Sequence, residues 1–174
     1  MFAHTMRFQY IQSLKRTMTE LIAPVETVQG QMYEEDGRVM PTGVELIMGE
    51  LTTVALIMIN ADLDISRKEI DLLNNFRQAV YGDKYVALAA ENYNELCQKF
   101  LSMYPSRCLS IDSTPYTVQY LQTYDREHGT DFADKAKAMF LQLAVTIASA
   151  DGRKDREEHI VLRNFKEVLY PQNQ

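Results

Sequence analysis

Residues 61–81 read ADLDISRKEIDLLNNFRQAVY, and residues 150–170 read ADGRKDREEHIVLRNFKEVLY. The two stretches are versions of one pattern, set 89 positions apart. Residues that recur in both copies include Ala61 and Ala150, Asp62 and Asp151, Glu69 and Glu158, Leu73 and Leu162, Asn75 and Asn164, Phe76 and Phe165, and Tyr81 and Tyr170. Such a duplication predicts two similar units that bury their apolar faces against each other.

Apolar residues recur every three to four positions along most of the chain, which is the spacing of one face of an α-helix. Residues 43–61 are apolar on nearly every side, as in a helix at the centre of a bundle. No short run alternates with a period of two between turn signals, so no strand is expected. The sequence predicts an all-α, single-domain bundle of about seven helices, built on two pseudo-symmetric helical hairpins at 43–81 and 131–170.

Capping and breaking residues predict where the helices begin and end. Thr5 is the expected N-cap of the first helix and Pro24 lies beyond its end, so residues 24–42 are interpreted as a connection. Residues 1–42 are thus an N-terminal helix and connection, and 43–174 a helical domain within one globular unit. The later helices are expected to begin near Thr42 or Gly43, Ser66, Asp83, Pro115, Thr130 or Asp131, and Asp155. The helix that begins at Asp83 is expected to end before Pro105, and the helix that begins at Pro115 is expected to end before Gly129.

Composition excludes several classes of protein. A length of 174 residues, with 46% hydrophobic and 24% charged residues, is typical of one globular domain. The net charge is −6 and the basic residues are scattered, which argues against a nucleic-acid partner. No secretory signal is seen, and the longest apolar run, 54–59, is far shorter than the roughly 20 residues of a membrane-spanning helix. Cys97 and Cys108 form no CxxC motif, so we expect free thiols in a cytoplasmic protein.

Each repeat carries an acidic turn between its two helices. These turns contain Asp62, Asp64, Ser66 and Glu69 in the first copy, and Asp151, Asp155 and Glu158 in the second. Carboxylate and hydroxyl oxygens are the ligands that a hard cation such as Ca²⁺ prefers. An EF-hand loop is excluded, because the positions that need glycine and glutamate hold Arg67 and Leu73.

Helix capping is the alternative explanation for part of this pattern. Ser66 with Glu69, and Asp155 with Glu158, have the spacing of a capping box, in which each cap contributes about 1 kcal/mol. Capping does not account for Asp62 or Asp151. Each follows the C-terminal end of a predicted helix, where the helix dipole disfavours an anion by about 0.3–1 kcal/mol.

An apolar helix that ends in A-D-G, followed by a glutamate seven positions after the aspartate and an amphipathic helix, resembles the TerB-like family. That family is all-helical and is associated with bacterial tellurite resistance and stress response. ADGRKDREEH at 150–159 matches the pattern in full, and ADLDISRKEI at 61–70 differs in having Leu63 where the pattern has glycine. The resemblance covers residues 43–81 and 131–171.

The resemblance implies a non-enzymatic domain that binds a metal or docks protein partners in membrane-associated stress complexes. Carried over position by position, the family's acidic residues fall on Asp62, Glu69, Asp151 and Glu158, which are the expected ligands of a divalent cation. Glycine adopts a left-handed backbone conformation far more readily than leucine. Gly152 therefore makes the second turn the better candidate.

A second hypothesis is a helical adaptor, in which the acidic turns are only caps and an apolar or tyrosine-rich groove binds a protein. Tyr104, Tyr116, Tyr120 and Tyr124 recur at near-helical spacing and are the candidate lining of that groove. An enzyme is not expected. His4, His128 and His159 have no nucleophile at a recognisable spacing, and the chain has neither a glycine-rich phosphate loop nor the two E-x-x-H motifs of a di-iron bundle.

Overall fold

The computed structural model describes residues 2–33, 40–61, 66–82, 87, 113–150, 152 and 156–171. These residues form six helices and no strand, so the all-α prediction is confirmed. The helices are α1 (Phe2–Tyr33), α2 (Gly43–Ile59), α3 (Arg67–Tyr81), α5 (Tyr116–His128), α6 (Phe132–Ala148) and α7 (Arg156–Leu169). The helix predicted from Asp83 to the residue before Pro105 falls outside the described residues.

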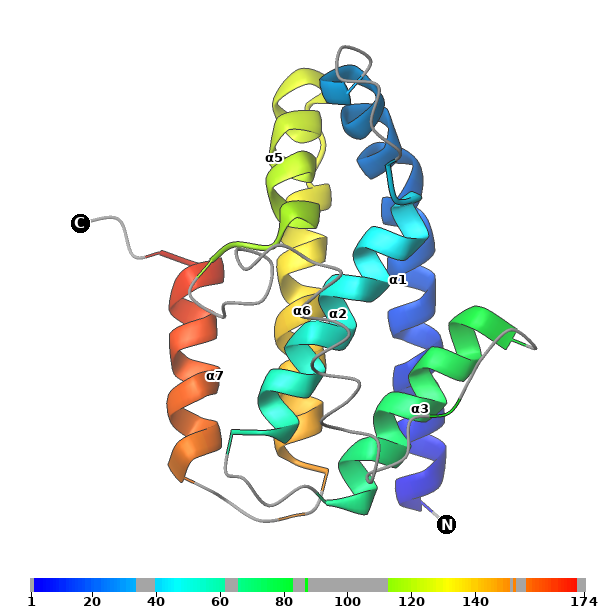
Figure 1. Ribbon diagram of the computed structural model, residues 1–174, viewed down its shortest axis with the longest axis vertical. Helices are drawn as coiled ribbons and strands as arrows, with labels where there is room; N and C mark the ends of the chain where they lie inside the picture. Colours follow the sequence, from blue (N-terminus) through cyan, green and yellow to red (C-terminus); the bar gives the residue numbers. More distant parts are fainter. Residues whose placement is uncertain are drawn as a thin grey trace.

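The two repeats supply the central pair of helices and one outer helix each (Figure 1). α2 and α6 pack against each other at the centre. α3 packs on α2 and also on α6, while α7 packs on α6 and also on α2. α6 begins and ends 89 positions after α2, which is the offset of the sequence repeat. This reciprocal packing is the arrangement that a duplicated hairpin with approximate symmetry would produce.

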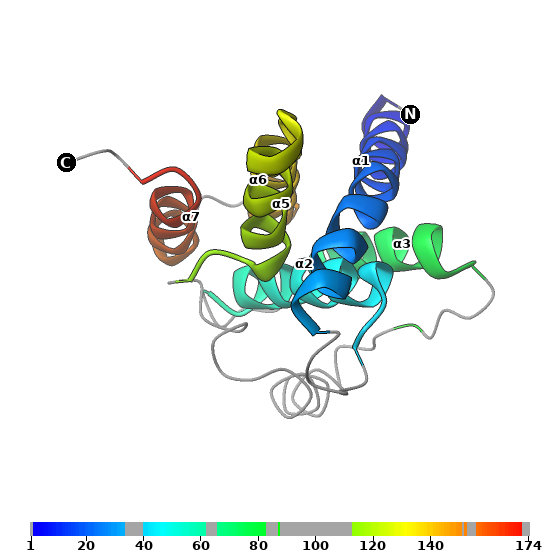
Figure 2. The same cartoon turned by 90° about the horizontal axis from the view of Figure 1, so that it is seen from above.

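α1 and α5 complete the bundle. α1 packs on α2, α3, α5 and α6, and α5 packs most extensively on α1 and α6. Seen from above in Figure 2, α1 and α7 lie on opposite sides of α6, and α2 crosses below α6 and α1.

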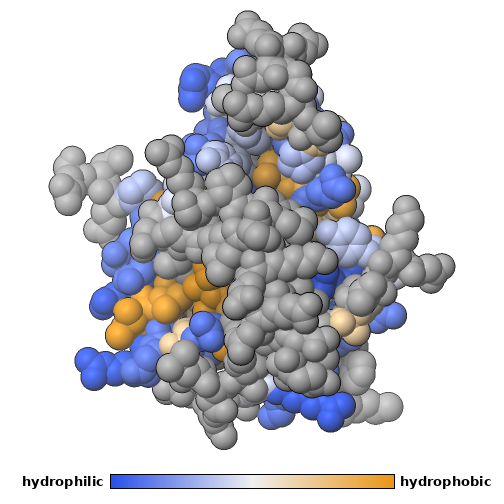
Figure 3. Space-filling view, in the orientation of Figure 1, coloured by the Kyte–Doolittle hydropathy of each residue, from blue (hydrophilic) through white to orange (hydrophobic). Residues whose placement is uncertain are grey.

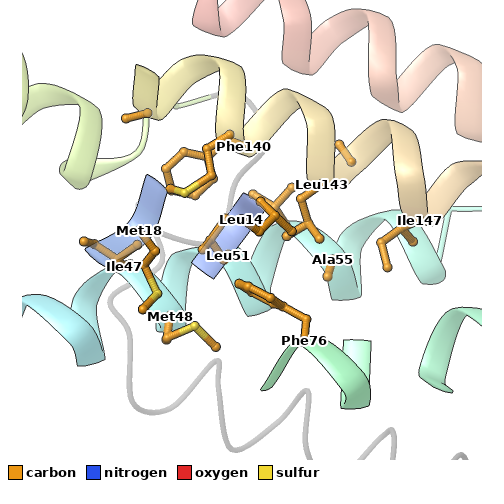
Figure 4. Packing of buried hydrophobic residues seen from close by; sticks show 14 of the residues in the cluster. Leu14, Met18, Ile47, Met48, Leu51, Ala55, Phe76, Phe140, Leu143 and Ile147 are labelled. Atoms are coloured by element: carbon orange, nitrogen blue, oxygen red, sulfur yellow. The ribbon is translucent and has the colours of Figure 1, made fainter. Parts of the chain in front are cut away.

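The hydrophobic core lies where α1, α2, α3 and α6 meet (Figure 4). None of the labelled core side chains is more than 3% exposed; they are Leu14, Met18, Ile47, Met48, Leu51, Ala55, Phe76, Phe140, Leu143 and Ile147. α2 is buried along almost its whole length, as its all-round apolar sequence predicts. Phe76 and Phe165, which occupy equivalent positions in the two repeats, are both buried.

α1 is longer than its sequence signals predict. It begins at Phe2, before the expected cap Thr5, and continues through Pro24 to Tyr33. The prediction that the helix ends before Pro24 is therefore wrong. A proline inside a helix costs about 3 kcal/mol. Val25 and Val28, which follow it, are buried in the core, and each such side chain contributes about 1.5–3 kcal/mol on burial.

Most of the other helix ends agree with prediction. Thr42 caps α2 and Ser66 caps α3, each through a complete capping box. Gly129, with φ of +67°, ends α5 in the left-handed conformation expected of a C-terminal glycine. Pro115 is the N-cap of α5, which begins at Tyr116, as expected of a helix that starts near this proline.

Candidate functional site

The helix ends that flank the two repeated turns lie at the same end of the molecule, the lower end in Figure 1. α2 and α6 both end there, and α3 and α7 both begin there. Because α2 and α6 pack against each other along the centre of the bundle, the duplication brings the ends of both hairpin helices to one end of the protein.

Only part of the predicted ligand set lies among the described residues. Asp62 and Asp151 fall outside them, as do Asp64 and Asp155. Glu69 and Glu158 lie in the first turns of α3 and α7, and their exposed fractions are 3% and 5%. In the part of the chain that the structure describes, no group of three or more His, Cys, Asp or Glu side chains is placed to hold a metal ion.

Glu69 closes a capping box at the start of α3. The backbone N–H of Ser66 donates to Glu69 Oε2 over 2.8 Å, and the backbone N–H of Glu69 donates to Ser66 Oγ over 3.3 Å. The predicted cap is thus confirmed in the first repeat. It places a carboxylate at the positive end of the helix dipole, where a negative charge is stabilised. Glu158 has the equivalent position in α7 and is also buried.

The second turn uses the conformational freedom of glycine. Gly152 has a backbone φ of +83°, in the left-handed region that residues with a side chain rarely adopt. A Cβ atom at Gly152 would meet no other atom within 4 Å, so the requirement for glycine comes from the backbone and not from crowding. The equivalent residue of the first turn, Leu63, lies outside the described residues, so the preference for the second turn stays a prediction.

A third buried carboxylate, Glu50, was missed by the sequence interpretation. It lies in the middle of α2 and is 3% exposed. Its Oε1 accepts a hydrogen bond from the backbone N–H of Tyr116 over 2.5 Å, and its Oε2 accepts one from the backbone N–H of Thr117 over 3.0 Å. Burial raises the pKa of the Glu50 carboxyl above its ordinary value, and the hydrogen bonds from α5 act in the opposite direction. A charged residue in a helix that is otherwise apolar all round was the available signal, because a buried charge requires partners.

Two further carboxylates cap a helix from a neighbouring element. Glu26 of α1 accepts a hydrogen bond from the backbone N–H of Gly43, at the start of α2, over 2.8 Å. Asp125 of α5 accepts hydrogen bonds from the backbone N–H groups of Phe132 and Ala133, at the start of α6. Capping by carboxylates is therefore a general feature of this fold, and it accounts for acidic residues well beyond the repeated turns.

The described tyrosines of the predicted cluster pack partly against the core of the bundle. Tyr116, Tyr120 and Tyr124 lie along α5 and contact the core, whereas Tyr104 falls outside the described residues. The rings of Tyr116 and Tyr120 stack with their centroids 6.1 Å apart, and the ring of Tyr124 stacks on His128 at 4.0 Å. Tyr120 is buried, whereas Tyr116 and Tyr124 are half-buried.

In the described part of the chain, no helix combines the length and hydropathy needed to cross a lipid bilayer. α2, the most apolar of the six, is 17 residues long and contains Glu45 and Glu50. This finding agrees with the prediction that the apolar segment belongs to the core.

Comparison with known families identifies the chain. The family described as tellurite resistance protein TerB matches residues 49–174, from within α2 onward. The matched span includes both repeated turns and all four predicted ligands. Comparisons with curated proteins and with solved structures found no match. Because the family match covers more than half of the chain and contains the helical repeat that the structure shows, the chain belongs to the TerB family.

Proposed function

We propose that this chain is a non-enzymatic, stress-associated binding module, and that a divalent cation such as Ca²⁺ binds at its repeated acidic turns. The observation that carries the proposal is the duplicated turn itself. The same aspartate and glutamate recur 89 positions apart, and the helices that flank both turns meet at one end of the bundle. Duplicated oxygen-rich turns are suited to a hard cation.

The aspartates and glutamates of the turns have different proposed roles. Glu69 already holds the start of α3 through Ser66, and Glu158 has the equivalent position in α7. We assign the direct ligand role first to Asp62 and Asp151, because capping does not explain an anion at the negative end of a helix dipole. The glutamates then order the turn before the cation arrives, which reduces the entropic cost of binding.

The broader role rests on the family. Its description links TerB to tellurite resistance, and we extend this link to a cytoplasmic stress module that acts through protein partners, in complexes associated with the membrane. The net charge of −6 supports a cationic ligand or a basic partner surface over a polyanion.

Thermal unfolding in the presence of Ca²⁺, Mg²⁺, Mn²⁺ or Zn²⁺ tests the cation proposal. A cation at about 100 times its dissociation constant adds about 2.7 kcal/mol to the free energy of unfolding. We expect at least one of the four to raise the midpoint of the wild type, and Asp151→Ala to remove that rise. Glu157→Ala is the matched control, since it removes an exposed carboxylate from the first turn of the same helix.

Two outcomes would contradict the cation site. One is a wild type whose midpoint none of the four cations raises, and the other is a rise that survives Asp151→Ala. Asp62→Ala distinguishes the two turns. We expect it to retain most of the rise, because the second turn has Gly152 in a left-handed conformation and the first has Leu63 at that position.

A protein-binding adaptor is the second candidate, and it is favoured by the cap geometry of Glu69. Exposed hydrophobic surface also supports it. Hydrophobic side chains gather over the α7 side of the face shown in Figure 3, and Ile160 and Tyr170 are 40% and 39% exposed. If the turns serve only as caps, the cations will leave the unfolding midpoint of the wild type unchanged. The midpoint of Asp151→Ala will likewise be the same with and without cations.

A further inference from the structure

We draw no further inference here: the strongest candidate, the groove between α1 and α6 lined by Leu14, Thr17, Lys135, Ala138, Met139 and Gln142, carries none, because nothing in the structure shows what covers it.

Discussion

Glu50 lies in α2, but its carboxylate caps the N-terminus of α5. The N-cap of α5 is Pro115, whose side chain has no hydrogen-bond acceptor. The first two amides of α5, those of Tyr116 and Thr117, donate to Glu50 instead. Burying a carboxylate without partners would cost several kcal/mol. Here the two amides and the positive end of the α5 dipole offset part of that cost, and they join α5 to a residue 66 positions before Tyr116.

Replacing Glu50 with alanine should destabilise the protein by about 3 kcal/mol. Two backbone N–H groups lose their acceptor, and each buried, unsatisfied donor costs about 1–3 kcal/mol. Urea denaturation would measure the change in the free energy of unfolding. Glu127→Ala, which removes an exposed carboxylate from α5, is the control and should change stability by less than about 0.5 kcal/mol. Equal effects of the two substitutions would show that Glu50 does not anchor α5.

Glu50 should also make stability depend on pH. Burial raises its pKa in the folded protein above the ordinary value of 4.5, so the folded state binds this proton more tightly than the unfolded state does. The contribution of Glu50 to the free energy of unfolding is therefore greatest below pH 4.5 and is lost as the pH rises through the raised pKa.

Glu50→Gln cannot titrate at this position, so comparison with it isolates the effect of the Glu50 proton. Urea denaturation of both proteins between about pH 4.5 and 7 gives the difference in their free energies of unfolding, in which the titration of the other groups largely cancels. We expect this difference to move in favour of the wild type as the pH falls. A difference that stays constant over the range would contradict the raised pKa.

At the scale of elements, the N-terminus of α6 is capped by a side chain of α5. Asp125 Oδ1 accepts hydrogen bonds from the Thr130 hydroxyl and the Phe132 N–H, and Oδ2 accepts one from the Ala133 N–H. Asp131 occupies the N-cap position of α6, but its side chain makes no capping hydrogen bond. It lies 3.3 Å from the ammonium group of Lys135 instead. The aspartate that caps α6 is thus not the one nearest in sequence to its start.

Asp125→Ala and Asp131→Ala form a matched pair, since one removes an aspartate from the last turn of α5 and the other removes the aspartate at the N-cap position of α6. Asp125→Ala should cost about 1–2 kcal/mol, the typical loss on removing an N-cap side chain. Asp131→Ala should cost less than about 0.5 kcal/mol, because an exposed ion pair contributes little. Chemical denaturation of the two variants would measure both values. The assignment of the cap to Asp125 fails if Asp131→Ala is the more damaging change.

The sequence predicted those helix ends that carry their own signals. Thr42, Ser66 and Gly129 act within four residues of their own helix end, so local spacing is enough to find them. Local spacing was not enough where a residue distant in sequence decides where a helix ends or which side chain caps it. Pro24 is tolerated because the residues after it reach the core, and Asp131 has no capping role because Asp125 already holds the α6 amides.

The same distinction, between local signals and partners distant in sequence, applies to the candidate site. The duplicated pattern located the two turns, and the capping role of Glu69 followed from its spacing to Ser66. Glu26 and Glu50 could not be recognised as caps, because their partners belong to other helices. The ligand role of Asp62 and Asp151 stays a prediction that the cation experiment decides.

For the whole molecule, the family match and the folded unit have different boundaries. The match begins at residue 49, yet α1 lies before it and packs on four other helices. Residues of α1 in the buried core include Leu14, Met18, Leu21, Val25 and Val28. Since α1 covers apolar faces of α2 and α6, the segment that the family match omits is an integral part of this bundle.

We therefore expect a chain shortened to residues 42–174 to lose cooperative unfolding. Without α1, buried surface of α2, α3, α5 and α6 would face water, and the protein should bind a hydrophobic dye and lack a sharp denaturation transition. Substitutions in the full-length chain give an independent measure. Leu21→Ala, at a fully buried position, should cost about 2–5 kcal/mol, whereas the neighbouring exposed Glu20→Ala should be nearly neutral. A shortened chain that unfolds in one sharp transition, together with a neutral Leu21→Ala, would show that α1 is an appendage and that the unit matched by the family folds without it.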